Sequence, residues 1–377
     1  MARIIIMTSG LRGILNASFE LANRLERAGH EVTLAAPRDG GEEERFDFLR
    51  LPDYVMNPSP ELPEFKGKWA KLKRLFYRIK HAQEHRQTAL AAVDVFATFA
   101  RSQDHDFNEN SKLPPDHQAR LEGSPVSELK SIKEKYNPDL LLIDVELHEY
   151  IFTAHHLNIK YKLLSQWYSL WDQPGLPYQL TNVVPGHGFA GSLLGMRLHW
   201  LMVKWQRFWM FKRMKWLSFG VDRRSVLQAL ARKYSFPKKL MSKNFWPGPF
   251  TYTGPPVLSM TPLEMEFPHD PPTWLTYIGP MVHHQRKEQA VTSTNGVELA
   301  EIFARKKQTG AKLIVCTVST LSVGDVRFLT RVMQAVAERK DWLLIIGLGG
   351  KIQPGAINVA TDNVFPFTYL PQLSCLR

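Results

Sequence analysis

The feature that most constrains the fold is a strand–helix–strand unit at the start of the chain. An apolar run at Arg3–Thr8 is followed by a turn at Ser9-Gly10, and apolar residues then recur at helical spacing over Ile14–Arg27. Gly29 ends this helix, and Glu31–Ala36 forms a second short apolar run. A strand, a helix, a glycine and another strand in this order open a parallel, doubly wound sheet. We therefore predict an α/β fold, which by itself does not indicate a function.

A second apolar strand ends in an acidic residue. Pro138–Asp144 is predicted as a strand, followed by a helix over Glu149–Leu157 and a strand over Tyr161–Leu164. In a parallel sheet the carboxyl ends of the strands face the ligand. The alternative is a helix N-cap with an acid in the first turn, and the sequence leaves both interpretations open. The candidate catalytic side chains at this strand end are Asp144, Glu146 and His148.

A second alternating unit occupies the last part of the chain. After a short strand in Trp274–Pro280 and a polar linker at 283–298, it begins with a helix near Leu299. Its further predicted elements are strands at Leu313–Thr317, at Trp342–Ile346 and near Val364, with a helix over Val326–Arg339. Two or three strands are fewer than a domain of ordinary size contains, so we expect this second domain, 299–377, to be incomplete.

Composition narrows the class of protein. A hydrophobic content of 44% with 22% charged residues excludes a disordered or fibrous chain. The sequence has no run of 18 uncharged apolar residues, so we do not expect a spanning helix. The two cysteines, Cys316 and Cys375, lack metal-ligand spacing and cannot form a disulfide framework. We expect no metal site and a reducing, cytoplasmic location.

The net charge of +12 comes from one segment. Arg197–Asn244 contains 13 Lys or Arg residues and one acid, and the rest of the chain is balanced. Within it, 193–217 holds four of the ten tryptophans and no acid. Trp with Lys and Arg suits an anionic membrane interface. Two alternatives are aromatic packing in a core and binding of single-stranded nucleic acid, but no nucleic-acid motif is present and that partner is not expected.

Several short segments carry a resemblance to a known family. In chain order they are Gly13–Asn16, Arg27–Thr33, Pro138–Asp144, Tyr277–Pro280, Val315–Thr320, Asn363-Val364 and Tyr369–Gln372. Together they resemble the UDP-glycosyltransferases of GT-B type, which include bacterial macrolide and carotenoid transferases. The resemblance implies two Rossmann-like parallel-sheet domains, the second incomplete. Residues 1–282 would be the acceptor-binding domain with a basic aromatic insertion at 193–244, and 299–377 a partial nucleotide-sugar-binding domain.

The implied reaction is transfer of a sugar from a UDP-sugar to a hydroxyl of an apolar, lipid- or carotenoid-like acceptor, with inversion. The UDP-sugar is a co-substrate, and no cofactor is implied. A general base must take the proton of the acceptor hydroxyl, and hydrogen-bond donors must hold the leaving diphosphate. The residues matching the family's donor site are Thr317, Ser319, Thr320, Tyr369 and Gln372, and those lining the acceptor cleft are Ile14 and Asn16.

The chain departs from the family pattern at important positions. Ile14 stands where the family has its catalytic His, so Asp144 lacks the usual partner there. Ser319 replaces a Gly, Tyr369 replaces a Trp, and the family's diphosphate-holding segment has no match after Gln372. These departures support a second hypothesis, a catalytically inactive relative that binds a ligand or a membrane. For either function we expect a cytoplasmic protein, peripheral on the inner face of the membrane.

Overall fold

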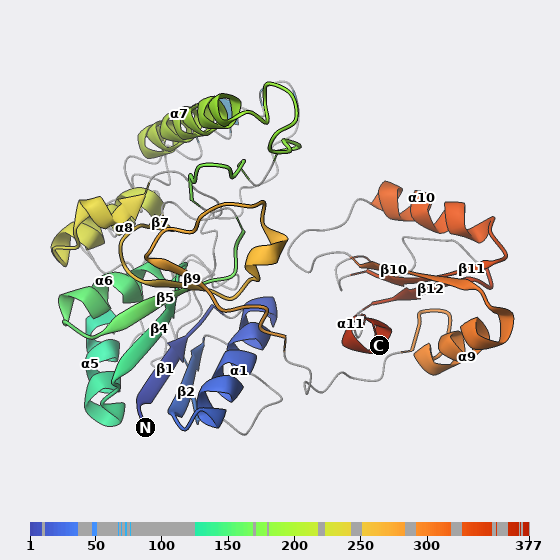
Figure 1. Cartoon of the computed structure of the whole chain (residues 1–377), viewed down its shortest axis with the longest axis horizontal. Helices are drawn as coiled ribbons and strands as arrows, with labels where there is room; N and C mark the ends of the chain where they lie inside the picture. The colour runs from blue at the N-terminus through green and yellow to red at the C-terminus, as the bar shows by residue number, and fades with distance from the viewer. Residues whose placement is uncertain are drawn as a thin grey trace. The chain divides into compact units, whose positions relative to one another are not determined.

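The structure is a computed structural model of the 377-residue chain. It describes residues 1–9, 12–36, 47–50, 67, 69, 72–73, 76, 125–168, 171–178, 181–217, 223–242, 251–282, 292–317, 326–348, 352, 361–368, 370 and 372–376. The chain divides into two compact units, Met1–His283 and His284–Arg377 (Figure 1).

The first unit is built on a parallel sheet. Its strands are β1 (Arg3–Met7), β2 (Glu31–Ala36), β3 (Asp47–Arg50), β4 (Leu140–Asp144), β5 (Tyr161–Ser165), β8 (Val257–Ser259) and β9 (Leu275–Tyr277). Within the described residues they form a seven-stranded sheet in the order β3-β2-β1-β4-β5-β8-β9, with every neighbouring pair parallel. A small antiparallel pair joins β6 (Met241–Ser242) to β7 (Thr251–Tyr252).

Helices cover both faces of this sheet. They are α1 (Arg12–Arg27), α5 (Pro125–Tyr136), α6 (His148–His156) and α8 (Arg223–Lys233). The first unit also contains a longer helix, α7 (Leu193–Leu217). Short 3-10 turns occupy Lys238–Leu240 and Leu263–Met265. Successive side chains of a strand point to opposite faces, so β1 contributes to two cores. Ile4 and Ile6 pack in the cluster that contains α1, whereas Ile5 and Met7 pack in the cluster that contains α5 and α6.

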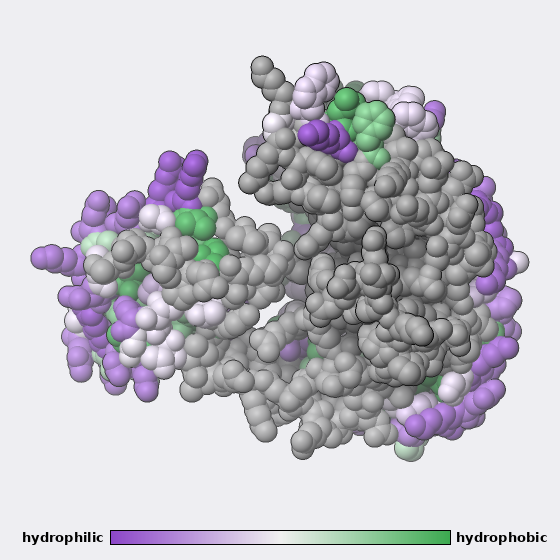
Figure 2. All heavy atoms as spheres, turned by 180° about the vertical axis from the view of Figure 1, so that it is seen from behind, coloured by the Kyte–Doolittle hydropathy of each residue, from purple (hydrophilic) through white to green (hydrophobic). Residues whose placement is uncertain are grey.

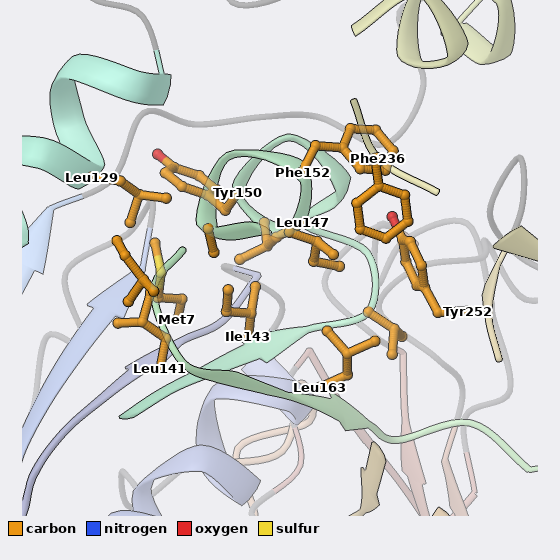
Figure 3. Close-up of a cluster of buried hydrophobic side chains, with 14 of the residues drawn as sticks. Met7, Leu129, Leu141, Ile143, Leu147, Tyr150, Phe152, Leu163, Phe236 and Tyr252 are labelled. Atoms are coloured by element: carbon orange, nitrogen blue, oxygen red, sulfur yellow. The ribbon is translucent and has the colours of Figure 1, made fainter. Parts of the chain in front are cut away.

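The larger core lies between the sheet and α6. Figure 3 shows Phe152 of α6 facing Phe236 and Tyr252, while Ile143 and Leu163 of the sheet lie beneath. The ring centroids of Phe152 and Phe236 are 4.9 Å apart, and those of Phe152 and Tyr252 are 6.3 Å apart. Such tilted aromatic contacts stabilise a core beyond the burial of their area. This packing attaches the segment around Tyr252 to α6.

The second unit repeats the α/β pattern. Its elements are α9 (Leu299–Thr309), β10 (Lys312–Thr317), α10 (Val326–Ala337), β11 (Trp342–Gly347), β12 (Val364–Phe367) and α11 (Gln372–Leu376). Its described strands form a three-stranded parallel sheet in the order β10-β11-β12. Leu329 of α10 packs with Leu344 of β11, and Ile302 of α9 packs with Phe365 of β12, so both faces are covered. The predicted α/β class, with two parallel-sheet units, is confirmed.

Replacing Phe152 should destabilise the first unit strongly. Its side chain is fully buried, so we expect Phe152→Ala to lower the free energy of unfolding by about 3–5 kcal/mol because a cavity replaces the ring. Phe189→Ala removes the same group from an exposed position and should change stability by less than about 0.5 kcal/mol. Chemical denaturation followed by circular dichroism measures both, and equal effects of the two variants would contradict the proposed core.

Candidate active site

The strand order of the first unit reverses beside β1. The chain moves from β1 outward to β2 and β3, then returns to place β4 on the opposite side of β1. In open α/β sheets, ligands bind at the carboxyl ends of the strands on either side of such a reversal. Ser9 follows β1 and Asp144 ends β4, so both lie at this point.

Asp144 is the best-defined polar group at the reversal. Asp144 is buried, with an exposed fraction of only 4%. Its Oδ2 accepts hydrogen bonds from the backbone N–H of Ser9 at 3.3 Å and from Ser9 Oγ at 3.1 Å, and its Oδ1 accepts the N–H of Glu146 at 3.0 Å. Burial raises the pKa of the Asp144 carboxyl above its ordinary value of 3.8, and the hydrogen bonds from Glu146 and Ser9 act in the opposite direction.

Asp144 does not cap a helix. The N-cap position of α6 is Leu147, which makes no side-chain capping hydrogen bond. The Asp144 carboxylate instead closes a turn on the N–H two residues ahead, and the Leu147 N–H donates to the Asp144 carbonyl at 2.9 Å. The carboxylate therefore organises the loop between β4 and α6 and connects that loop to Ser9.

Glu146 lies in the same turn, and its Oε2 is buried although the residue as a whole is not. Its residue is partly exposed, unlike Asp144 and His148. The indole Nε1 of Trp167, just after β5, donates to Glu146 Oε1 at 2.8 Å. The carboxylate is thus oriented by a side chain from the neighbouring strand end.

His148 points into the core. It is 2% exposed, and its Nδ1 lies 2.7 Å from the hydroxyl of Tyr252. Their ring centroids are 5.7 Å apart. The three catalytic candidates predicted from the sequence are therefore close in the chain but differ in environment, since His148 packs against the aromatic core and the two acids remain at the strand end.

The predicted acceptor-cleft residues lie at the start of α1. Ile14 is buried, and Asn16 is partly exposed. Gln166, which follows β5, donates through Nε2 to the carbonyl of Ile14 at 3.1 Å. The sequence analysis missed Gln166 and Trp167, although both follow a strand end in the same manner as Asp144. Both residues directly follow the strand Tyr161–Ser165, and this position is the feature of the sequence that could have identified them as site residues.

The predicted donor residues belong to the second unit. Thr317 is exposed at the carboxyl end of β10, and Gln372 is the exposed first residue of α11. Ser319, Thr320 and Tyr369 lie outside the described residues. Among the described residues, no cluster of three or more His, Cys, Asp or Glu side chains is arranged to hold a metal ion.

Comparisons with known proteins relate the chain to solved structures alone. No protein-family model matches the chain, and no curated protein matches it. A glycosyltransferase of kitacinnamycin is similar at 16% identity and a TM-score of 0.47, covering 100% of this chain and 73% of that one. The calicheamicin glycosyltransferase CalG4 is 14% identical with a TM-score of 0.46, over 99% of this chain and 71% of that one.

A third similar structure is the glycosyltransferase VinC in complex with dTDP. It is 16% identical to this chain with a TM-score of 0.45, over 98% of this chain and 72% of that one. These neighbours are glycosyltransferases, and their identities are too low to transfer an activity. The function is therefore inferred from this chain's own residues.

The buried carboxyl of Asp144 should give stability a distinctive pH dependence. Because the pKa is raised in the folded state, the folded protein binds this proton more tightly than the unfolded chain does. The resulting stabilisation is complete below about pH 3.8 and is lost as the pH rises through the folded pKa. Asp144→Asn lacks this titration. The melting temperature of the variant minus that of the unsubstituted chain should therefore become more positive as the pH rises above about 4.

The exposed Asp270 provides the control for this measurement. Asp270→Asn also removes one carboxylate, and we expect its difference in melting temperature not to follow the trend of Asp144→Asn. A difference for Asp144→Asn that is independent of pH would show that burial does not raise the pKa of this group.

Proposed function

We propose that the chain transfers a sugar from a UDP-sugar to the hydroxyl of an apolar acceptor, with inversion at the anomeric carbon. The observation that carries the proposal is the Asp144 carboxylate, held by Ser9 at the strand-order reversal, with the partly exposed Glu146 in the same turn. The reversal is where such sheets bind ligands, and the reaction needs a proton acceptor there.

Glu146 is the proposed general base. The acceptor hydroxyl gives its proton to the Glu146 carboxylate as its oxygen forms a bond to the anomeric carbon. The bond from that carbon to the phosphate oxygen breaks, and UDP leaves with the electron pair. Asp144 and His148 are only 4% and 2% exposed, whereas Glu146 is partly exposed, so an acceptor hydroxyl can reach Glu146 more readily. The hydrogen bond from Trp167 to Oε1 orients the carboxylate.

Asp144 is proposed as a positioning residue. Its two oxygens receive N–H groups from both sides of the reversal, so it fixes the backbone of Ser9 and of Glu146. Preorganised geometry of this kind lowers the cost of bringing the base to its substrate. His148 has a structural part in this scheme, since its ring contacts Tyr252 inside the core.

The second unit is proposed to bind the nucleotide-sugar donor. Thr317, at a strand end, and Gln372 are the described residues that match the family's donor site. In the same proposal Thr317 and Thr320 lie near the diphosphate, and Tyr369 and Gln372 lie near the nucleoside, where the Tyr369 ring would stack on the uracil. Ser319 belongs to the same proposed donor site. Thr and Ser hydroxyls and backbone N–H groups supply the hydrogen-bond donors that a leaving diphosphate requires.

A second candidate function is ligand binding without catalysis. The observation that favours it is Ile14, a buried apolar side chain where the resemblance implies a catalytic His. An isoleucine cannot accept a proton, so a chain without a substitute base would bind its ligands and leave them unchanged. Turnover separates the two candidates.

Glu146→Gln should abolish most of the turnover. We expect kcat with UDP-glucose and umbelliferone, an apolar coumarin with one hydroxyl, to fall by about 10²–10⁴-fold because the amide cannot take a proton. The KM for UDP-glucose should stay within about twofold, since Glu146 is not assigned to donor binding. UDP release measures both parameters.

Glu134→Gln is the matched control, because Glu134 is exposed on α5, before the amino end of β4. It should leave both parameters unchanged. A kcat for Glu146→Gln equal to that of the unsubstituted chain would reject Glu146 as the base. UDP binding without UDP release by the unsubstituted chain would favour the non-catalytic candidate.

A further inference from the structure

Helix α7 has an inner apolar face that packs on its own unit. Trp200 is 1% exposed, and its ring lies 5.2 Å from that of Tyr178, measured between centroids. Its Nε1 donates to the carbonyl of Leu176 at 2.9 Å. Met196 and Val203, one turn away on either side, are buried as well. This face accounts for the attachment of α7.

The opposite face of α7 is also apolar, and it is exposed. Trp205 is 64% exposed and Trp216 is 76% exposed. Residues three or four apart lie on one side of a helix, so the exposed side chains form a continuous row. The row consists of Leu194, Leu198, Leu201, Met202, Trp205, Phe208, Trp209 and Trp216. We call this row the outer face of α7.

The preceding loop extends the outer face. Ser192 Oγ accepts the N–H of Gly195 at 3.0 Å and donates to the carbonyl of Phe189 at 2.7 Å, so it caps the helix and fixes the loop. A Cβ added to Gly195 would lie 2.0 Å from the Phe189 carbonyl oxygen, which shows how closely the loop approaches the helix. Phe189 and Leu193 are exposed beside this junction.

Positive charge borders the outer face, and α7 contains no acid. Lys204 pairs with Asp172, and Arg207 donates to the Tyr178 hydroxyl at 3.3 Å, so both turn toward the inner side. The exposed bases of the helix are Arg197, Lys212, Arg213 and Lys215.

Lys212 lies among the aromatic rings. Its Nζ is 4.8 Å from the centroid of the Trp209 ring and 5.9 Å from that of Phe208. An ammonium group beside exposed indole and phenyl rings is the combination found at the headgroup level of a bilayer. In Figure 1 α7 lies outside the layers made by the sheet and its covering helices, and in Figure 2 green and pale residues gather at the corresponding end of the first unit.

We propose that the outer face of α7 docks on an anionic lipid bilayer, with the helix lying in the plane of the interface. The aromatic and aliphatic row enters the boundary between headgroups and acyl chains, and the four exposed bases contact anionic headgroups. None of the helices in the described part of the chain combines the length and the apolar character that crossing a bilayer requires.

Charge favours a bilayer over a second copy of the chain. A two-fold dimer through the outer face would bring the same bases of both copies together, with no acid on α7 to neutralise them. An anionic surface neutralises all of them at once. The same sign of charge continues along α8, where Arg232 and Lys233 are exposed.

The docking surface is connected to the candidate active site through one segment of the chain. The inner face of α7 binds the segment 171–178, through Asp172, Leu176 and Tyr178. That segment follows the carboxyl end of β5, the same edge of the sheet at which Asp144 and Glu146 lie. Docking would therefore bring a membrane-dissolved acceptor to this side of the unit, although the docking itself does not depend on turnover.

Vesicle sedimentation of the full chain tests the proposal. The chain should bind phosphatidylcholine vesicles that contain about 30% phosphatidylserine, and much less tightly pure phosphatidylcholine vesicles. Raising the salt from about 50 mM to about 500 mM should weaken the binding to the anionic vesicles, since screening shortens the range of the charges.

Two pairs of variants locate the contact. The double variant Trp205→Ala, Trp209→Ala should weaken binding by at least about tenfold, since two rings leave the interface. Its control is Phe328→Ala, at an exposed site in the second unit, which should change binding by less than about twofold.

The second pair tests the charge. The double variant Lys212→Glu, Arg213→Glu should also weaken binding by at least about tenfold. Lys306→Glu with Lys307→Glu makes the same charge change at exposed positions of α9 and is the control.

Three outcomes would overturn the proposal. One is no binding to anionic vesicles at low salt by a chain that melts cooperatively. Another is an equal loss of binding in the α7 and α9 charge variants, which would show that net charge and not this surface matters. The third is a chain that does not bind vesicles but self-associates in sedimentation equilibrium, with the self-association abolished by Trp205→Ala together with Trp209→Ala. That result would assign the outer face to a second copy of the chain.

Discussion

The hydrogen bonds between the Asp144 carboxylate and Ser9 join the carboxyl ends of β1 and β4, and the candidate active site depends on them. A buried carboxylate is costly unless it is hydrogen-bonded, and here backbone N–H groups from both strand ends offset that cost. The contact exists because β1 and β4 are adjacent and parallel, with Met7 opposite Ile143. The same carboxylate closes the turn that holds Glu146, so the register of two strands sets the position of the proposed base.

In the proposed reaction the proton acceptor stands at another strand end than Ile14, the position at which the resemblance implies a histidine. A base at the start of α1 would act from beside β1. The proposed base, Glu146, lies beyond β4, and the indole of Trp167 from beyond β5 donates a hydrogen bond to it. Ile14 still has a role in the site, because its carbonyl accepts hydrogen bonds from Gln166 and from Ser18. The backbone at this position thus connects α1 to β5 even though its side chain has no acid–base chemistry.

Helix α7 differs from an ordinary surface helix because both of its faces are apolar. A helix at the surface of a water-soluble domain buries one apolar stripe and presents a polar one to solvent. Here the inner stripe centres on Trp200 and the outer row on Trp205, Trp209 and Trp216. Exposed apolar area of this kind indicates a binding surface, and the surrounding excess of bases indicates the sign of its partner's charge.

The sequence by itself determined the α/β class, many of the strands and helices of the two units and the strand end near which Asp144, Glu146 and His148 lie, because the periods of strands and helices are local properties of the chain. It did not identify β3, α5, α8 or β8. The sequence also showed that the whole excess of positive charge lies in one segment, 197–244. Only the tertiary structure decided which way each side chain faces. His148 meets Tyr252, Gln166 meets Ile14, and Trp200 rather than Trp205 turns inward toward Tyr178. These contacts join residues far apart in the chain, so they depend on how the strands and helices pack, which no local pattern encodes.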